Sequence, residues 1–337
     1  MNPQPLSDLV PTAGVHQDGE AANLTPNLAG LHQQARHYLQ QARADHTRRA
    51  YLADWRRFET WCRLHDASPC PASVETVVLY LTEEARTRQV STLRRRLSAL
   101  AEAHRAAGHE SPTGAQAVRL LLAGISREKG KASHGRKPLL ISDLDAMLHA
   151  LPEGRLGVRD RALLLIGFAG AFRRSELVAL NWDDLEFRPE GVVVTLRHSK
   201  TDPEGQGRRV AIPHASKAYR CPIRALLAWR AACPPDLTEA GSPVFHPFAQ
   251  NQCPRLARLS DKAVARVVKR LLQACGRDAS EYSGHSLRAG FATAAAMGGA
   301  PERLIMNQTG HRSTATLRRY IREANLFLHN AADYTGL

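Results

Sequence analysis

Four fragments in the second half of the chain carry side chains that can bind phosphate or move protons. Guanidinium groups bind phosphate oxygens in pairs, imidazole and ammonium groups exchange protons, and a tyrosine hydroxyl can attack phosphorus. Together, their order and spacing predict a site that breaks and rejoins a phosphodiester without a metal ion, with tyrosine as the nucleophile. The fragments are GAFRRSEL with Arg173, RHSKTD with Lys200, SGHSLRAG with His285 and Arg288, and TGHRSTATLRRY with His311 and Tyr320.

Arg173 and Arg174 are adjacent at the point where a helix is expected to open with Ser175. Cations at the positive end of a helix are disfavoured by roughly 0.3 to 1 kcal/mol, so this pair calls for a negative partner. A bound phosphate would supply that charge. An ion pair with Glu176 or Asp183 would supply it as well, and the sequence leaves both readings open.

His285 and Arg288 follow a glycine and are three residues apart. On a helix this spacing puts both side chains on one face, where they can share a ligand. A guanidinium fork beside an imidazole suits the negative charge of a phosphoryl transition state. Taken alone, a pair with this spacing can also cap or bridge helices.

Tyr320 lies in the basic sequence RRYIR. A phenol has a pKa of about 10, so it is a poor nucleophile unless cations such as Arg173, Arg288 and Lys200 stabilise the phenolate. Lys200 is expected to end a strand before a turn, from which its ammonium could protonate a leaving oxygen, although a hairpin lysine is more often only solvated. His311, nine residues before Tyr320, taken alone is more often a packing or capping residue.

The elements that must hold these residues are mostly helical. Residues 1–23 mix Pro, Gly, Asn and Gln without periodicity and are expected to form a flexible leader. Residues 24–128 are expected to form a small helical domain, in which an apolar stripe recurs at helical spacing. That stripe consists of Tyr51, Trp55, Phe58 and Cys62.

A second helix of this domain is expected to be capped by Ser91 and to carry a basic face. Its apolar stripe places Arg95 on the opposite side, with Arg94 and Arg96 beside it. From residue 86 to 137 there are twelve Lys and Arg against three Asp and Glu, a formal charge of +9. The stripe is Leu93, Leu97 and Leu100.

The second half is expected to be mainly α with a small β-sheet or hairpin. Residues 129–137 read as a linker, and residues 138–337 as a catalytic domain that ends in a docking helix. A helix starts at Ile141, and Arg159 to Gly170 is apolar nearly all round, which predicts a buried helix. Residues 191–213 contain the only convincing strand pair, GVVVTLRHSK and RRVAIP.

Composition sets the outer limits of these interpretations. A chain of 337 residues with a formal charge of +14 and 43% hydrophobic residues is expected to form globular domains that bind a polyanion, most simply nucleic acid. It contains no apolar run of about 20 residues and no signal pattern at its N-terminus, so we expect a cytoplasmic protein, associated with a bacterial nucleoid. The six cysteines form no CxxC pair and are expected to be reduced, without a metal or disulfides.

The combined motifs resemble the tyrosine recombinase, or phage integrase, family. RxSEL, GHSLR, and GH with Tyr nine residues after the His match the family signature of Arg, Lys, HxxR, His/Trp and Tyr over about residues 40 to 325. The layout looks closest to the Cre-like members, to which DHTRRAYLADWRRFETWCRLHD, QVSTLRRRLSAL, RLSDKAVARV and YSGHSLRAG are similar. His311 departs from those members, which have tryptophan there, but agrees with most of the family.

The resemblance implies a C-shaped clamp of two domains and a transesterification that needs no metal, cofactor or ATP. Tyr320 would attack the scissile phosphate to give a 3′-phosphotyrosine, and partner DNA would reverse the attack through a Holliday junction. The implied roles are oxygen binding by Arg173, Arg288 and His311, protonation of the 5′ oxygen by Lys200, help with the tyrosine proton by His285, and positioning by Glu176.

The implied partners are duplex DNA with an inverted-repeat recombination site and further copies of the chain in a homotetramer on synapsed DNA, with no membrane and no small-molecule substrate. The C-terminal NLFLHNAADYTGL has enough apolar residues to dock on a neighbour. The candidates for DNA contact are Arg49, Thr92, Arg94, Arg95 and Lys262, although each also fits an ordinary solvated basic face.

Three alternatives remain open. A type IB topoisomerase shares the tyrosine chemistry but only relaxes supercoils, and the Cre-like N-terminal segments argue against it. A sequence-specific DNA-binding protein without catalysis would not need the full residue set. A metal-dependent DDE transposase is the weakest alternative, because Asp183 and Asp184 lack a plausible third carboxylate.

Overall fold

The computed structural model describes residues 30–31, 33–34, 38, 45–130, 136–197, 207–249, 253–311, 313–314 and 318. The chain divides into two compact units, Met1–His134 and Gly135–Leu337. Within the described residues, no helix is long and apolar enough to cross a membrane. The site residues His285, Arg288 and His311 are described, whereas Lys200 and Tyr320 lie outside the described residues.

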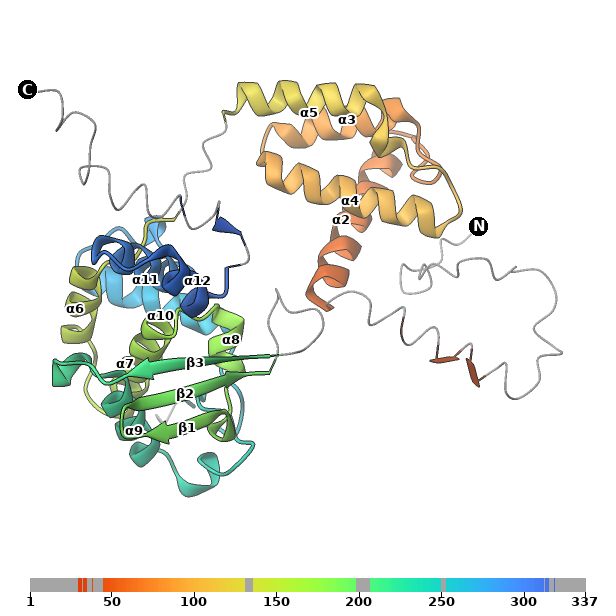
Figure 1. The fold of residues 1–337 in the computed structure, drawn as a ribbon. Helices are drawn as coiled ribbons and strands as arrows, with labels where there is room; N and C mark the ends of the chain where they lie inside the picture. The colour runs from red at the N-terminus through yellow and green to blue at the C-terminus, as the bar shows by residue number, and fades with distance from the viewer. Residues whose placement is uncertain are drawn as a thin grey trace, which may run out of the picture. The chain divides into compact units, whose positions relative to one another are not determined.

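The first unit is a helical bundle, as the periodicity predicts (Figure 1). Helix α2 packs on α4, and α3 packs on α5. Trp55, Phe58 and Cys62 of the expected stripe are at most 6% exposed, and the Phe58 ring meets Tyr80 with centroids 5.0 Å apart. The described elements are α2 (Asp45–Leu64), α3 (Val74–Ala85), α4 (Val90–Ala106), a 3-10 turn η1 (Pro112–Gly114) and α5 (Gln116–Glu128).

Helix α4 corrects two expectations. It begins at Val90 with Gln89 as the N-cap, so Ser91 lies inside the first turn and does not cap it. Arg96 is not on the solvated basic face, because it is only 3% exposed. Position 96 lies three residues after Leu93, on the buried side of the helix, where its guanidinium pairs with Glu84 and Asp54.

The second unit surrounds a larger hydrophobic core with helices and one small sheet. Its described helices are α6 (Ile141–His149), α7 (Arg155–Ala169), α8 (Arg174–Ala179), α9 (Pro222–Ala232), α10 (Asp261–Ala274), α11 (Ser286–Met297) and α12 (Glu302–Thr309). Short 3-10 turns are η2 (Trp182–Asp184), η3 (Ala218–Arg220), η4 (Pro235–Leu237) and η5 (Ala279–Glu281).

Helix α7 is the centre of this unit. Leu163, Leu164 and Ile166 are completely buried, which confirms a helix that is apolar nearly all round. It begins four residues earlier than the expected Arg159, which is itself 5% exposed and pairs with the buried Asp160. The helix ends at the glycine turn that leads to the first candidate site residue.

The sheet has three antiparallel strands in the order β1 (Leu185–Arg188), β2 (Gly191–Leu196) and β3 (Arg208–Pro213) (Figure 1). The strand pair 191–213 is thus confirmed, but β1 was not expected because LEFR is too short to show a period. The strand expected to run to Lys200 ends at Leu196, which pairs with Arg208. The next residue, Arg197, turns its side chain to Asp183 and Asp184 at 2.6 Å.

The segment before α6 lies tightly against α11. The Leu139 amide donates to the Ser286 carbonyl at 2.9 Å, and a Cβ on Gly290 would fall 1.9 Å from the Leu139 oxygen. Arg136 and Lys137, the last residues of the expected linker, bond to Ser280 and Glu281 of the same unit. The start of α11, which carries the HxxR motif, is therefore held in place by the segment before α6, about 145 residues earlier in the sequence.

Candidate active site

The first site residue is held by a strained turn at the end of α7. Ala171 has a φ of 49°, in the left-handed region that a residue with a Cβ seldom adopts. A Cβ on Gly170 would lie 2.2 Å from the Phe172 ring, so the turn also needs glycine there. The turn delivers Arg173 to the N-cap of α8, as the motif GAFRRSEL led us to expect.

Arg173 and Glu176 form a two-point contact. The Arg173 amide donates to Glu176 Oε2 at 2.8 Å, and the Arg173 Nη1 donates to Glu176 Oε1 at 2.5 Å. Glu176 is 3% exposed, whereas the Arg173 side chain is 20% exposed. Glu176 is thus the carboxylate partner of Arg173, and the alternative partner Asp183 pairs with Arg197. A carboxylate that contacts both the amide and the side chain of Arg173 fixes the orientation of the guanidinium.

Arg288 reaches the same turn from α11. It is 1% exposed, and its Nη1 donates to the Ala171 carbonyl at 2.9 Å. His285 is exposed and forms the N-cap of α11, with helical dihedral angles. The HxxR motif therefore has one member in solvent contact and one buried, and the buried one touches the backbone that leads into Arg173.

His311 follows the left-handed glycine that ends α12, Gly310, with φ 64° and ψ 39°. Its Nδ1 is 2.8 Å from the Thr309 Oγ1. The Thr309 hydroxyl gives its hydrogen to the Ile305 carbonyl at 2.6 Å. We therefore infer that Nδ1–H of His311 is the donor to Thr309, which leaves Nε2 of the neutral ring without a proton.

The pKa of His311 links the candidate residues to one another. Burial and, to a smaller extent, the charges of Arg288, Arg173, His285 and Arg208 together lower the pKa of His311 to about 4. An imidazole with a pKa this low is neutral near pH 7. The described candidate residues thus interact electrostatically with His311, although they come from α8, α11 and the end of α12.

The sequence interpretation missed Arg208, the first residue of β3. Its Nη1 donates to the carbonyls of Gln308 and Asn307 at 3.0 and 3.3 Å, and its Nη2 lies 3.8 Å from Glu176 Oε2. The alternation of β3 gives a signal that could have found it. Arg208 shares the inward face with Val210 and Ile212, and a charged residue on a core-facing register needs a partner.

A family model of the phage integrase family matches residues 138–326. An "Integrase/recombinase xerD homolog" of Selenomonas ruminantium is 40% identical over 312 residues, which cover 91% of this chain and 90% of that protein. The chain belongs to the phage integrase family. As the motifs indicated, it is a tyrosine recombinase, an enzyme that transfers DNA strands at specific sites.

Further comparisons place the recombinase within the family. "Recombinase cre" of Escherichia phage P1 is 24% identical over 301 residues, which cover 84% of this chain and 85% of that protein. The expected Cre-like resemblance is present, at lower identity than to the XerD homolog. The Tn1549 transposon integrase, solved in complex with transposon right end DNA, aligns with a TM-score of 0.57 and 15% identity over 98% of this chain and 96% of its own. That likeness shows the fold.

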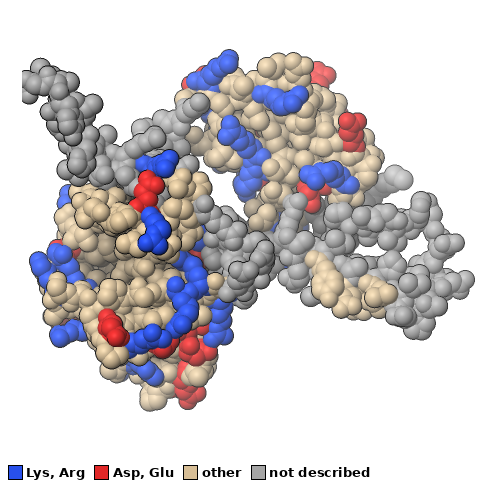
Figure 2. Space-filling model, in the orientation of Figure 1, with Lys and Arg blue, Asp and Glu red and all other residues tan. Residues whose placement is uncertain are grey.

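The candidate DNA-contact residues of the recombinase lie in different settings. Arg49 and Lys262 are exposed, and Thr92 is half-buried. The Arg95 side chain is 45% exposed, but its Nη2 contacts Asp54 Oδ1 at 3.2 Å. Figure 2 shows basic side chains spread over the visible faces of both units, with acidic ones between them. Arg95 therefore already pairs with Asp54, and a DNA base would have to compete with this carboxylate for its guanidinium.

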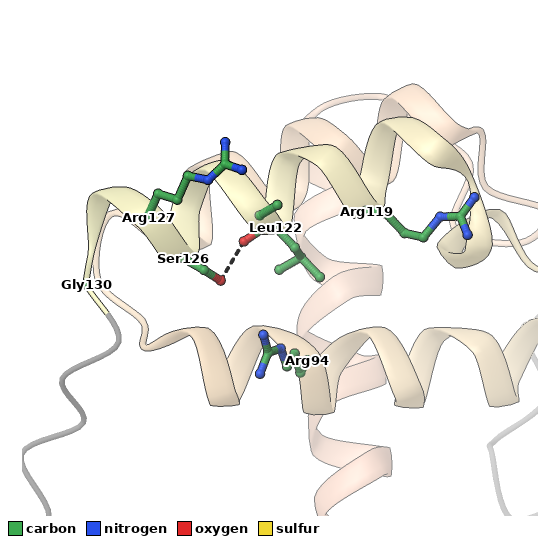
Figure 3. Close-up of a pocket in the computed structure, with 7 residues that line it drawn as sticks. Arg94, Arg119, Leu122, Ser126, Arg127 and Gly130 are labelled. Carbon is green, nitrogen blue, oxygen red and sulfur yellow. Dashed lines mark hydrogen bonds between the residues drawn. The ribbon is translucent and has the colours of Figure 1, made fainter.

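Arg94 lines a cleft between α4 and α5 (Figure 3). The cleft has a volume of about 550 Å³, and Arg119 and Arg127 reach it from α5. No hydrogen bond or ion pair of these three side chains is found within the described part of the chain, in contrast to Arg95 and its partner Asp54. The sequence interpretation counted Arg119 and Arg127 among the cations but did not name them as contacts.

Proposed function

We propose that the recombinase cleaves and rejoins duplex DNA through a 3′-phosphotyrosine on Tyr320, without metal or ATP. The observation that carries this proposal is the contact of Arg288 with the Ala171 carbonyl in the turn that leads to Arg173, and it is supported by the lowered pKa of His311, to which burial and both arginines contribute. Two guanidiniums and an imidazole match the charge that develops on the non-bridging oxygens of a phosphoryl transition state.

The proposed step exchanges one ester for another. The Tyr320 oxygen forms a bond to phosphorus, the bond from phosphorus to the 5′ oxygen breaks, and Lys200 supplies the proton that the 5′ oxygen gains. His285 takes the tyrosine proton. Because a phosphodiester is replaced by a phosphotyrosine ester, the reverse attack by a 5′ hydroxyl needs no external energy.

His311 would bind an oxygen of the same phosphate. The neutral ring has no proton on Nε2, so donation to phosphate requires the imidazolium. The negative charge of the phosphate raises the pKa of His311 toward its ordinary value, against burial and the neighbouring guanidiniums, which lower it. Phosphate binding and protonation of His311 are thus coupled.

Recombination also needs DNA recognition, for which we propose the basic face of the first unit and Lys262 of α10 in the second unit. Arg94, Arg119 and Arg127 around the α4–α5 cleft would contact DNA phosphates. Arg95 with Thr92, and also Arg49 and Lys262, stay candidates for base contacts. The proposed target is an inverted repeat, and the proposed assembly is a homotetramer that passes through a Holliday junction. The cytoplasmic, nucleoid-associated location stays a prediction.

Covalent capture tests the function. Bound duplexes would be selected from a random or native DNA library with the Tyr320→Phe variant, and then incubated with wild-type protein in EDTA. We expect a protein–DNA adduct on a denaturing gel with wild type and none with Tyr320→Phe, because only the phenol can form the ester. Binding without an adduct would favour a non-catalytic DNA-binding protein. Relaxation of any supercoiled plasmid, without exchange between sites, would favour the topoisomerase alternative.

A further inference from the structure

Arg208 lies where three parts of the site meet. It opens β3, two residues beyond the segment 198–206 that contains Lys200. Its guanidinium reaches the last carbonyls of α12, and a Cβ on Gly310 would fall 2.9 Å from its Cζ atom. From Gly310 the chain continues directly to His311 and, ten residues on, to Tyr320.

Glu176 is shared between two guanidiniums. Its Oε1 accepts from the Arg173 side chain at 2.5 Å, and its Oε2 accepts from the Arg173 amide at 2.8 Å. The same Oε2 lies 3.8 Å from Arg208 Nη2, an ion-pair distance. The carboxylate is 3% exposed, so little solvent screens these charges from each other. Arg208 therefore acts on Arg173 through the carboxylate that both residues face.

Arg208 is poorly placed to bind DNA itself. Its Nε and Nη2 atoms are shielded from solvent, without a hydrogen-bond acceptor among the described residues. Its Nη1 is already used by the two α12 carbonyls. Burial lowers the pKa of Arg208, and the Glu176 carboxylate only partly offsets this effect. Placing a cation there costs free energy, which a well-packed apolar side chain would avoid.

The contact with α12 follows from helix physics. The last carbonyls of a helix have no partner within the helix and carry its partial negative charge. The Arg208 guanidinium satisfies two of them, while Gln308 ties the same end of α12 to the Ala169 carbonyl of α7 at 2.9 Å. The end of α12 is thus fixed on one side to the turn before Arg173 and on the other to the start of β3.

We propose that Arg208 is a positioning residue that fixes Arg173 and His311 relative to each other, by holding Glu176 and the C-terminal end of α12 at the same time. This inference rests on the proposed function of the site. A guanidinium suits the task because its planar fork can face a carboxylate and two carbonyls at once, whereas an ammonium is a point charge. Without Arg208, the positions of Arg173 and His311 relative to each other are no longer fixed.

The test compares Arg208→Met with Arg208→Lys and with a matched control, Arg209→Met. Arg209 is the next residue of β3, but its side chain is 59% exposed and pairs with Glu186 at 2.6 Å, on the other face. Cleavage would be measured as the rate of adduct formation on a nicked duplex that traps the phosphotyrosine. Affinity for the same duplex, thermal unfolding and the pKa of His311 by histidine NMR would be measured in parallel.

We expect Arg208→Met to slow cleavage roughly 10- to 100-fold, since small displacements of binding groups have effects of this size. Affinity for DNA should change little, and the pKa of His311 should rise because a nearby cation is removed. Arg208→Lys should keep the low pKa of His311 but recover only part of the rate. Arg209→Met should stay within about twofold of wild type, as exposed ion pairs contribute little.

Three outcomes would overturn the inference. Cleavage by Arg208→Met at the wild-type rate would show that the bridge does not position the site. A loss of affinity as large as the loss of rate would make Arg208 a phosphate contact. An unchanged His311 pKa in a folded Arg208→Met protein would show that the two residues are not coupled. Failure of wild type and Arg209→Met to form any adduct would instead count against the proposed function, and the His311 pKa would then decide the placement by itself.

Discussion

Glu176 is 3% exposed, yet it faces two guanidinium groups that come from α8 and β3. At the residue scale, the site consists of charged side chains of which several are buried from solvent. The guanidinium groups of Arg288, Arg173 and Arg208 act on His311 electrostatically, and one described carboxylate lies against Arg173 and Arg208. Without DNA, burial and, to a smaller extent, the neighbouring positive charge keep the imidazole neutral. The arrival of a phosphate supplies the missing negative charge, so binding and protonation are linked.

His311 should therefore titrate near pH 4 in the free protein and at a higher pH when DNA is bound. Histidine NMR on Tyr320→Phe protein, with and without a duplex carrying its site, measures both values. His311→Asn identifies the resonance. An unchanged pKa on DNA binding would mean that this imidazole does not face the phosphate.

The same shift predicts a dependence of stability on pH. Because the folded-state pKa of about 4 lies below the ordinary 6.5, the contribution of His311 to the free energy of unfolding is fully present above pH 6.5. It is lost as the pH falls from 6.5 through about 4, where the unfolded chain binds a proton that the folded chain resists. Denaturant unfolding of wild type and His311→Asn across this range should show a steeper acid decline for wild type.

At the element scale, α4 and α5 sort the arginines of the first unit by the partners that they find. Arg96 is buried in ion pairs with Glu84 and Asp54, and Arg95 shares Asp54. Arg94, Arg119 and Arg127 line the cleft between the helices (Figure 3). The first two support the bundle, while the last three are placed to meet an anion from outside.

This division predicts different effects on DNA binding. Arg119→Gln should weaken binding on every sequence and reduce the slope of log affinity against log salt by about 1, because one phosphate contact is lost. Arg95→Ala should relax the preference at one or two base positions if Arg95 leaves Asp54 to read a base edge. Affinity measured on a panel of single-base variants at several salt concentrations separates the two. Equal losses on all sequences for Arg95→Ala would make it a phosphate contact.

At the scale of the whole molecule, the second unit has an apolar groove next to the site. The groove has a volume of about 490 Å³ and lies between α6, α7, α11 and α12, with Phe168, Phe291 and Leu304 in its wall. The C-terminal residues 326–337, which lie outside the described residues, include the apolar letters LFL. Docking of that segment on a neighbouring copy would support the proposed tetramer.

Deletion of 326–337 should abolish recombination between two sites and leave binding to a single site intact, because only the contact between copies is lost. Leu304→Glu, which charges the groove at a half-exposed position, should have the same effect. Leu227→Glu on α9 is the matched control, since Leu227 is similarly exposed but does not line the groove. Recombination at the wild-type level by the deleted protein would exclude this docking.

Local patterns in the sequence predicted much of the fold and most of the candidate site residues. The stripe Trp55, Phe58 and Cys62, the buried α7 and the hairpin of β2 and β3 follow from periodicity, which depends on each element alone. The motifs likewise named Arg173, His285, Arg288 and His311, because phosphoryl chemistry restricts the residue types that can serve. Their roles, and those of Lys200 and Tyr320, stay predictions.

The tertiary structure decided what depends on contacts between distant segments. Nothing near position 96 in the sequence shows that Asp54 and Glu84 would bury its charge, and the LEFR strand became visible only as the partner of β2. Arg208 is one of many arginines in the sequence, and only the packing of β3 against Glu176 and α12 distinguishes it. The sequence by itself determined which groups can do the chemistry, since that follows from their functional groups. The fold alone decided which charges share a buried space, because burial and ion pairing arise between segments that sequence distance does not relate.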